Sequence, residues 1–288
     1  MGKLRYAVHA YAWTGRWSNQ TLDLIDRAKG LGFDAIEIPL AEIERVDAKR
    51  IRERLDAVGM AVITSTACSA ETDITADDEE TRRRGLEYLE RCVRATAAIG
   101  ATCFTGVTYS ALGRRIAGFP DERHWQRSAE GLKKVARLGQ ELGVTVGIEP
   151  VNRYESFLVN TCEQALRLKD MIGEPNVAIH LDAYHMNIEE NEFYEPTRRA
   201  APYLCHYHLS ESHRGIPGTG TVDWDAIFRA LSEGGYQGLV GMESFAEPSP
   251  AMAAATCTWR AMAPSSDFAL REGLSFLKRL EAKYFGER

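Results

Sequence analysis

The sequence predicts an α/β fold, a (β/α)8 TIM barrel, because one pattern recurs along its 288 residues. A helical stretch ends in an apolar residue and a glycine, and a short β-rich run follows. Glycine readily adopts the left-handed conformation that ends a helix. Thus Leu31 and Gly32 precede the run 33–38, and Leu142 and Gly143 precede the run 144–149. Eight strands alternating with eight helices favour a closed parallel barrel over a doubly wound open sheet.

The predicted elements follow in order along the chain. The third helical pattern is typical, since Leu86, Leu89, Val93 and Ala97 recur every three or four residues on one face. We expect strands at 6–10, 33–38, 60–66, 101–107, 144–149, 176–182, 205–210 and 238–245. We expect helices at about 19–31, 47–58, 78–99, 122–142, 162–172, 192–201, 223–234 and 267–284. No Gly/Ser- or Pro-rich linker divides them, so residues 1–288 should form a single barrel domain.

Composition narrows the possible partners. Hydrophobic residues make up 44% and charged residues 26% of the chain, and the net charge is −6. This acidic balance argues against nucleic acid as a partner. The sequence has neither a signal-peptide pattern nor an apolar run of membrane-spanning length, so we expect a cytoplasmic protein that does not bind membranes. The six cysteines lack metal-site or disulfide spacing, which predicts reduced packing residues.

Four successive predicted strands end in residues that can bind a metal. Glu149, Asp182, His208 and Glu243 stand at the carboxyl ends of strands five to eight, where ligands bind in α/β barrels. Asp182 is preceded by His180 on the same side of its strand. Buried carboxylates so close together would repel one another unless a cation lay between them. Three carboxylates and one imidazole suit Mn²⁺, Co²⁺ or Mg²⁺ better than a structural zinc.

The loops that follow these strands carry further polar groups. Glu155, His185 and Arg214 each lie three to six residues beyond one of the four candidate metal ligands, so they should surround the same pocket. The irregular stretches 110–120 and 212–222 also follow strands and should cover the catalytic mouth. Aromatic side chains near the ends of early strands could form a wall against the carbon face of a sugar. These are Tyr11, Trp13 and Tyr109, together with His9.

Several long motifs resemble one family of enzymes. They are EPVNRYESFLVN (149–160), HLDAYHMNIEE (180–190), HYHLSESHRGIPGTG (206–220), MESF (242–245) and the pair Trp259 and Arg260. Together they resemble the D-tagatose 3-epimerase family of ketose 3-epimerases, which includes D-psicose (allulose) and L-ribulose 3-epimerases. The match is close in the carboxyl-terminal half and is one of layout in the amino-terminal half. There His9 stands where many members have Phe or Tyr, and Ser65 and Thr66 stand where others have Cys, Ile or Gly.

The resemblance implies a (β/α)8 barrel that epimerises free ketoses at C3 through a cis-enediolate. It implies that Glu149, Asp182, His208 and Glu243 bind the metal. A divalent cation, most often Mn²⁺, would stabilise the enediolate, and Glu149 and Glu243 would act as the acid and base on opposite faces of C3. The residues at substrate-binding positions would be Glu155, His185, Arg214 and His9. We expect the chain to act as a homodimer or homotetramer.

Other functions remain open at this stage. An aldose–ketose isomerase, a hydroxypyruvate-isomerase-like enzyme or an inosose dehydratase would use the same barrel, metal and paired carboxylates. A sugar-binding module without turnover is disfavoured, because Glu149 and Glu243 are both intact. An endonuclease IV-like enzyme is also disfavoured, because that chemistry needs several metals, more histidines and a basic face.

Overall fold

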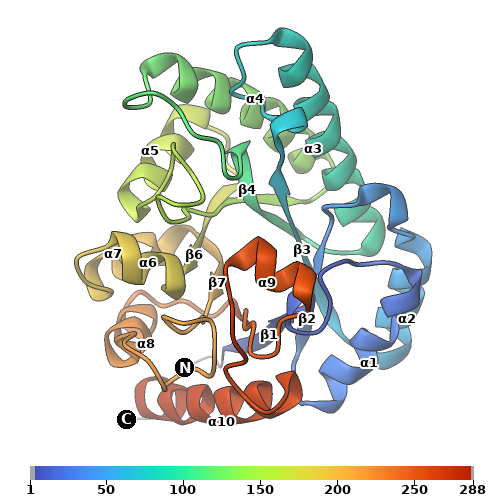
Figure 1. Cartoon of the computed structure of the whole chain (residues 1–288), viewed down its shortest axis with the longest axis vertical. Coiled ribbons are helices and arrows are strands. Elements are labelled where there is room, and N and C mark those ends of the chain that lie inside the picture. Colours follow the sequence, from blue (N-terminus) through green and yellow to red (C-terminus); the bar gives the residue numbers. More distant parts are fainter. Residues whose placement is uncertain (1–3, 287–288) are drawn as a thin grey trace.

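Eight parallel strands close into a barrel in the computed structural model, which describes residues 4–286 (Figure 1). The strands follow one another around the barrel in chain order, and β1 pairs with β2 on one side and β8 on the other. The strands are β1 (Arg5–His9), β2 (Ala35–Pro39), β3 (Ala61–Cys68), β4 (Cys103–Ala111), β5 (Thr145–Ile148), β6 (Val177–Asp182), β7 (Leu204–His208) and β8 (Leu239–Met242). The predicted fold class is confirmed.

Helices surround the barrel, and eight of them correspond to the predicted helical patterns. These are α1 (Asp23–Gly30), α2 (Ala48–Val58), α3 (Glu79–Ile99), α4 (Glu122–Glu141), α5 (Cys162–Ile172), α7 (Tyr194–Ala200), α8 (Trp224–Glu233) and α10 (Ser266–Phe285). Two short helices were not predicted, α6 (Ala183–Glu189) and α9 (Pro250–Thr256). In Figure 1, α9 lies across the middle of the barrel and α10 along its lower edge.

The glycines that were predicted to stop helices have the expected backbone conformation. Gly59 and Gly100, for example, follow α2 and α3 with φ of 61° and 90°, and their N–H groups bond the last turn. A residue with a Cβ would be strained there. This local signal is why the alternation of helices and strands could be predicted from the sequence.

The hydrophobic core lies mainly between the strands and the helices around them. Leu89 and Val93 of α3, for example, are fully buried, as the predicted helical face requires. The barrel interior is different, because ionisable side chains lie there. Glu37, His180 and His206 are fully buried and His9 is 3% exposed. Groups of this kind are costly to bury unless they are paired, so their arrangement needs a separate explanation.

Three other predictions concern the whole chain. The single domain was predicted over residues 1–288, of which 1–3 and 287–288 lie outside the described residues. Among the described helices, none combines the length and apolarity needed to cross a membrane. The six cysteines are free, and four are buried as expected for packing residues. Cys257 is exposed, so the packing prediction is wrong for that residue, which lies just after α9.

Candidate active site

Four side chains converge at the carboxyl ends of strands β5 to β8. They form the carboxylate–histidine cluster: Glu149, Asp182, His208 and Glu243. Asp182 and His208 are the last residues of β6 and β7 and lie opposite each other in the register. Glu149 and Glu243 directly follow β5 and β8. Each is at most 9% exposed, so three carboxylates meet in a region almost free of solvent.

The geometry of the cluster fits a divalent cation. Nδ1 of His208 is buried and has no hydrogen-bond partner among the described residues. It lies 3.8 Å from Glu149 Oε1, 3.6 Å from Asp182 Oδ2 and 3.7 Å from Glu243 Oε2. Ligand atoms about 2.1 Å from a shared cation lie roughly 3.0 to 3.5 Å apart. Ligand atoms of Glu149, Asp182 and His208 all lie within 4.8 Å of one another, so a modest contraction would let these three side chains share one ion, and Glu243 reaches the same imidazole nitrogen.

Electrostatics favour a cation in the same place. Burial raises the pKa of the Glu149 carboxyl well above its usual range, and the neighbouring Glu243 and Asp182 add to the rise. Burial alone would lower the pKa of His208, but Glu37 and Glu243 outweigh it and raise that pKa well above the usual value. The rise for His208 indicates negative charge around its ring, and the rise for Glu149, caused first by burial and then by its carboxylate neighbours, points the same way.

Arg214 neutralises part of that charge in this structure. Its Nη1 donates to Asp182 Oδ2 over 2.8 Å and also contacts Glu243 Oε2 closely. The guanidinium stacks 4.0 Å from the centre of the Tyr184 ring. Arg214 is 7% exposed, and its backbone has a φ of 62°, which is unusual for a residue with a side chain. The turn therefore aims the arginine into the pocket at some cost in backbone energy.

The segment after Arg214 is held by another buried carboxylate, Glu211. This side chain accepts hydrogen bonds from the backbone N–H groups of Ser212, Gly218 and Val222 and from the indole of Trp224, over 2.8 to 3.2 Å. One side chain thus ties together both ends of the predicted loop 212–222. These bonds fix the loop around Arg214, which is 7% exposed.

His185 is held by the loop after β5. Its Nδ1 accepts the backbone N–H of Asn152 over 3.1 Å, and its Nε2 lies 3.2 Å from Nη2 of Arg214, a group that can only donate. Burial lowers the pKa of His185 to about 4, which keeps the ring neutral near pH 7. Asn152 also donates from Nδ2 to Glu155 Oε1 over 2.8 Å. The site therefore holds a neutral imidazole, His185, between the Arg214 guanidinium and Asn152, whose side-chain amide also reaches the Glu155 carboxylate.

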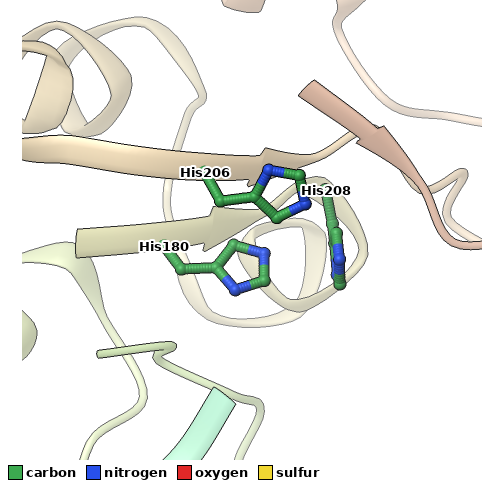
Figure 2. A group of neighbouring side chains, drawn as sticks. All are labelled: His180, His206 and His208. Carbon is green, nitrogen blue, oxygen red and sulfur yellow. The ribbon is translucent and has the colours of Figure 1, made fainter. Parts of the chain in front are cut away.

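A second group of ring nitrogens lies deeper in the barrel. His180, His206 and His208 point toward one another from β6 and β7 (Figure 2). Both ring nitrogens of His206 have partners, since Nδ1 lies 3.2 Å from the carbonyl of Leu239 and Nε2 lies 3.1 Å from Glu37 Oε2. Because both ring nitrogens of His206 already have partners in the barrel, this side chain is not free to bind a metal. The carboxylate–histidine cluster is therefore the better cation site.

The pocket above the cluster combines predicted and unpredicted residues. His9 and Tyr11 line it as predicted, together with Glu155, His185 and Arg214. Trp13 and Tyr109, by contrast, do not line it. The Trp13 indole bonds Asp267, and the fully buried Tyr109 hydroxyl bonds the carbonyl of Val159, so both belong to the packing around the barrel.

Parts of the pocket wall come from segments beyond the strands. Leu112, from the loop after β4, contributes one part. Met252, Ala255 and Thr256 of α9 contribute another. The predicted covering stretch 110–120 begins two residues later than expected, because β4 continues to Ala111. The loops after β4 and β7 both reach the mouth, as predicted from their positions after strands.

Comparison with known proteins identifies the family. The sequence profile of the xylose isomerase-like TIM barrel family matches residues 25–280. A ketose 3-epimerase from Arthrobacter globiformis is 37% identical over 248 residues, which cover 84% of each chain. The chain belongs to the ketose 3-epimerase family. An L-ribulose 3-epimerase from Methylomonas sp. is 33% identical over 280 residues, 96% of this chain and 98% of that one.

Solved structures of family members have the same fold. A D-allulose 3-epimerase from Methylomonas sp., in complex with D-allulose, superposes with a TM-score of 0.91 and 33% identity. The match covers 97% of this chain and 98% of that chain. The resemblance seen in the sequence motifs is thereby confirmed. The motifs from the carboxyl-terminal half carried it, and the structure shows why, since they supply all four members of the carboxylate–histidine cluster.

The structure also contains site residues that the sequence reasoning missed. Glu37 is fully buried in β2, and its Oε2 lies 2.7 Å from His208 Nε2. The His208 and His9 imidazoles outweigh the effect of burial and hold the pKa of Glu37 well below its usual range. The sequence contained a signal for Glu37, because this glutamate interrupts the apolar run 35–39. Glu149 likewise stands next to an apolar run, that of β5. Asn152, which positions His185, was also missed.

Proposed function

We propose that this protein is a metal-dependent ketose 3-epimerase, an isomerase that interconverts free ketoses at C3. The observation that carries the proposal is the convergence of three carboxylates on the unpartnered Nδ1 of His208 at the base of a pocket. The named activities of the family relatives support the same assignment. The ligands we propose are Glu149, Asp182, His208 and Glu243.

Epimerisation at C3 requires removal of a proton next to the ketone and its return to the opposite face. A bound divalent cation would supply Lewis-acid stabilisation of the negative charge that develops on the substrate oxygens. Glu149 and Glu243 follow different strands, β5 and β8, and both reach the same imidazole. We assign them the proton transfers on the two faces of C3, with the roles of base and acid exchanged between the two directions.

The polar groups around the cluster would hold the sugar. His185 offers a neutral ring whose Nε2 faces Arg214, and Glu155 offers an acceptor that is bonded to Asn152. Arg214 can donate to substrate oxygens once a cation has taken over the charge of Asp182 and Glu243. His9 lies farther along the pocket wall, where its Nε2 faces Ser65 Oγ at 3.2 Å. These four residues are the proposed substrate-binding set.

The finer assignments rest on the chemistry of the donor set and of the surface. Mn²⁺ is the proposed ion, with Co²⁺ and Mg²⁺ as alternatives, because three carboxylates and one imidazole suit these ions. The free cysteines support a reducing, cytoplasmic location. Exposed aromatic side chains support a homodimer or homotetramer, since Phe119 is 96% and Trp259 73% exposed. We propose one domain over residues 1–288, supported by the closed barrel of the described residues.

The proposed reaction can be tested at a single carbon. Incubating fructose, tagatose or ribulose with the Mn²⁺-loaded protein in D₂O should place deuterium at C3 and produce the 3-epimer, as read by NMR. An aldose–ketose isomerase on the same barrel would instead label C1 of the ketose or C2 of the aldose and accumulate aldose. Label at C1 with aldose product would contradict the epimerase assignment. Absence of exchange into all three ketoses would contradict turnover of free ketoses.

A further inference from the structure

Glu37 has a position that needs an explanation beyond packing. It is the central residue of β2, it is fully buried, and every residue of that strand is buried with it. Its carboxylate faces the barrel interior, where Oε2 bonds the rings of His206 and His208 and Oε1 lies near the ring of His9 without a hydrogen bond to it. A buried carboxylate without hydrogen-bond donors would be strongly destabilising, so these contacts are what allow it to be there.

The contacts of Glu37 define the state of the His208 ring. Glu37 Oε2 lies 2.7 Å from His208 Nε2 and 3.1 Å from His206 Nε2, and Oε1 lies 3.3 Å from His9 Nε2. A carboxylate only accepts hydrogen bonds, so His208 Nε2 must carry a proton and donate it. When the ring is neutral, its lone pair is therefore on Nδ1. Nδ1 is the atom that faces Glu149, Asp182 and Glu243.

Gly241 lets the rings take this arrangement. A Cβ on Gly241 would lie 2.7 Å from His206 Nε2 and 3.2 Å from His208 Cδ2. The β8 backbone therefore packs against the edge of both rings, and Glu37 bonds them through Nε2. The His208 ring is thus held by backbone on one side and by a charged acceptor at the nitrogen remote from the cluster.

We propose that Glu37 is a positioning residue that fixes the orientation and the tautomer of His208 and thereby raises the affinity of the carboxylate–histidine cluster for a divalent cation. The inference rests on the cation site of the proposed function. It adds a residue from β2, in the amino-terminal half, to a site whose other members all come from β5 to β8. Partners of this kind orient metal-binding histidines, and their loss weakens metal binding about 10- to 100-fold.

The first test compares Mn²⁺ binding by chelated wild-type protein and Glu37→Gln, using calorimetry. The glutamine side chain has the same shape as glutamate, but one of its two terminal atoms is a donor and cannot accept from a histidine. We therefore expect the dissociation constant for Mn²⁺ to rise about 10- to 100-fold. Asp73→Asn is the matched control. Asp73 is also a buried carboxylate, bonded to Thr75 and Arg114, but it is remote from the cluster. Its variant should bind Mn²⁺ like the wild type.

The outcomes separate the two proposals. Wild-type protein that binds no Mn²⁺ would remove the cation site and with it the proposed function. Wild-type binding with equal affinity in Glu37→Gln would overturn the role of Glu37 and leave the proposed function intact. Equal weakening in Asp73→Asn and Glu37→Gln would also overturn it, because general destabilisation would then explain both.

A second measurement needs no variant and applies even if Glu37→Gln fails to fold. In ¹⁵N-histidine-labelled wild-type protein loaded with diamagnetic Mg²⁺, the NMR signals of His208 should show a proton on Nε2 that exchanges slowly with water. Nδ1 should carry none. A His208 ring protonated on Nδ1, or an Nε2 without its proton, would overturn the proposal directly.

Discussion

Replacing Arg214 by alanine separates the charge of the site from its backbone geometry. Alanine keeps the Cβ, so the backbone cost of the positive φ is unchanged and only the guanidinium is lost. In the metal-free protein this leaves Asp182 and Glu243 buried without their cationic partner. Removing one partner of a buried ion pair costs about 3–5 kcal/mol.

The cost can be converted into a melting temperature. An unfolding entropy of about 2.1 cal/mol/K per residue gives roughly 0.6 kcal/mol/K for a chain of 288 residues. The chelated Arg214→Ala protein should therefore melt about 5–8 °C below chelated wild type. With saturating Mn²⁺ the gap should narrow, because the ion takes over the neutralisation of both carboxylates. Substrate affinity should remain weakened, because the donor is still missing.

Thermal unfolding followed by circular dichroism, with and without chelator, measures the two differences in melting temperature. Arg83→Ala is the matched control, since Arg83 also contacts two carboxylates, Glu80 and Glu87, but all three are more than half exposed. Exposed pairs contribute at most about 1 kcal/mol, so the control should melt within about 2 °C of wild type. Equal melting temperatures for Arg214→Ala and Arg83→Ala without metal would refute the reasoning.

Three further experiments, with four variants, test other parts of the site. Glu149→Gln and Glu243→Gln should each lower turnover by roughly 10²-fold or more, as measured by chromatography of the ketose products. A variant that keeps a rate near that of the wild type would exclude its glutamate from proton transfer. Glu211→Gln should lower the free energy of unfolding by about 2–4 kcal/mol in urea and raise KM, because one side-chain amide cannot accept from all four donors around it. An unchanged KM would contradict the role of Glu211 in holding the loop. The pKa of His185 is about 4 in the folded protein, against about 6.5 for an unperturbed histidine, so the unfolded chain binds the proton first as pH falls. The free energy of unfolding of the wild type should therefore fall by up to about 3 kcal/mol between pH 6.5 and 4 through this residue, and that of His185→Asn should fall correspondingly less. Parallel pH profiles of stability for the two proteins would contradict the lowered pKa.

Local signals explain how much of the fold could be predicted. The glycines after the helices and the apolar runs after them are short-range features, so the eight strands and eight main helices were found from them. The two missed helices lack those features. Helix α6 begins directly at the end of β6, where Asp182 caps it by accepting the Tyr184 N–H, so no turn residue marks its start. Helix α9 is a short alanine-rich segment that is followed by Cys257, in the left-handed conformation, and not by a glycine.

The candidate site was predictable where its residues stand at strand ends. A glutamate or histidine at the carboxyl end of an apolar run is visible in one dimension, which is how Glu149 and His208 were found. Contacts between remote strands are not visible in this way. Glu37 meets His208 across 171 positions of sequence, and Asn152 meets His185 across 33. Trp13 and Tyr109 show the limit of the same signal, since aromatic side chains at strand ends can equally point into the surrounding packing, which was the favoured role for both.

Two parts of the pocket wall lie in other segments of the chain than the two glutamates proposed to transfer protons. Leu112 follows β4 and Met252 and Thr256 belong to α9, whereas Glu149 and Glu243 are fixed at the ends of strands. Sequence change in the wall can therefore alter which sugar fits while the strands keep the proton-transfer geometry. For directed evolution, a library confined to the loop after β4 and to α9 would vary substrate preference at little risk to folding. The same division would let related enzymes diverge in substrate while retaining one chemistry.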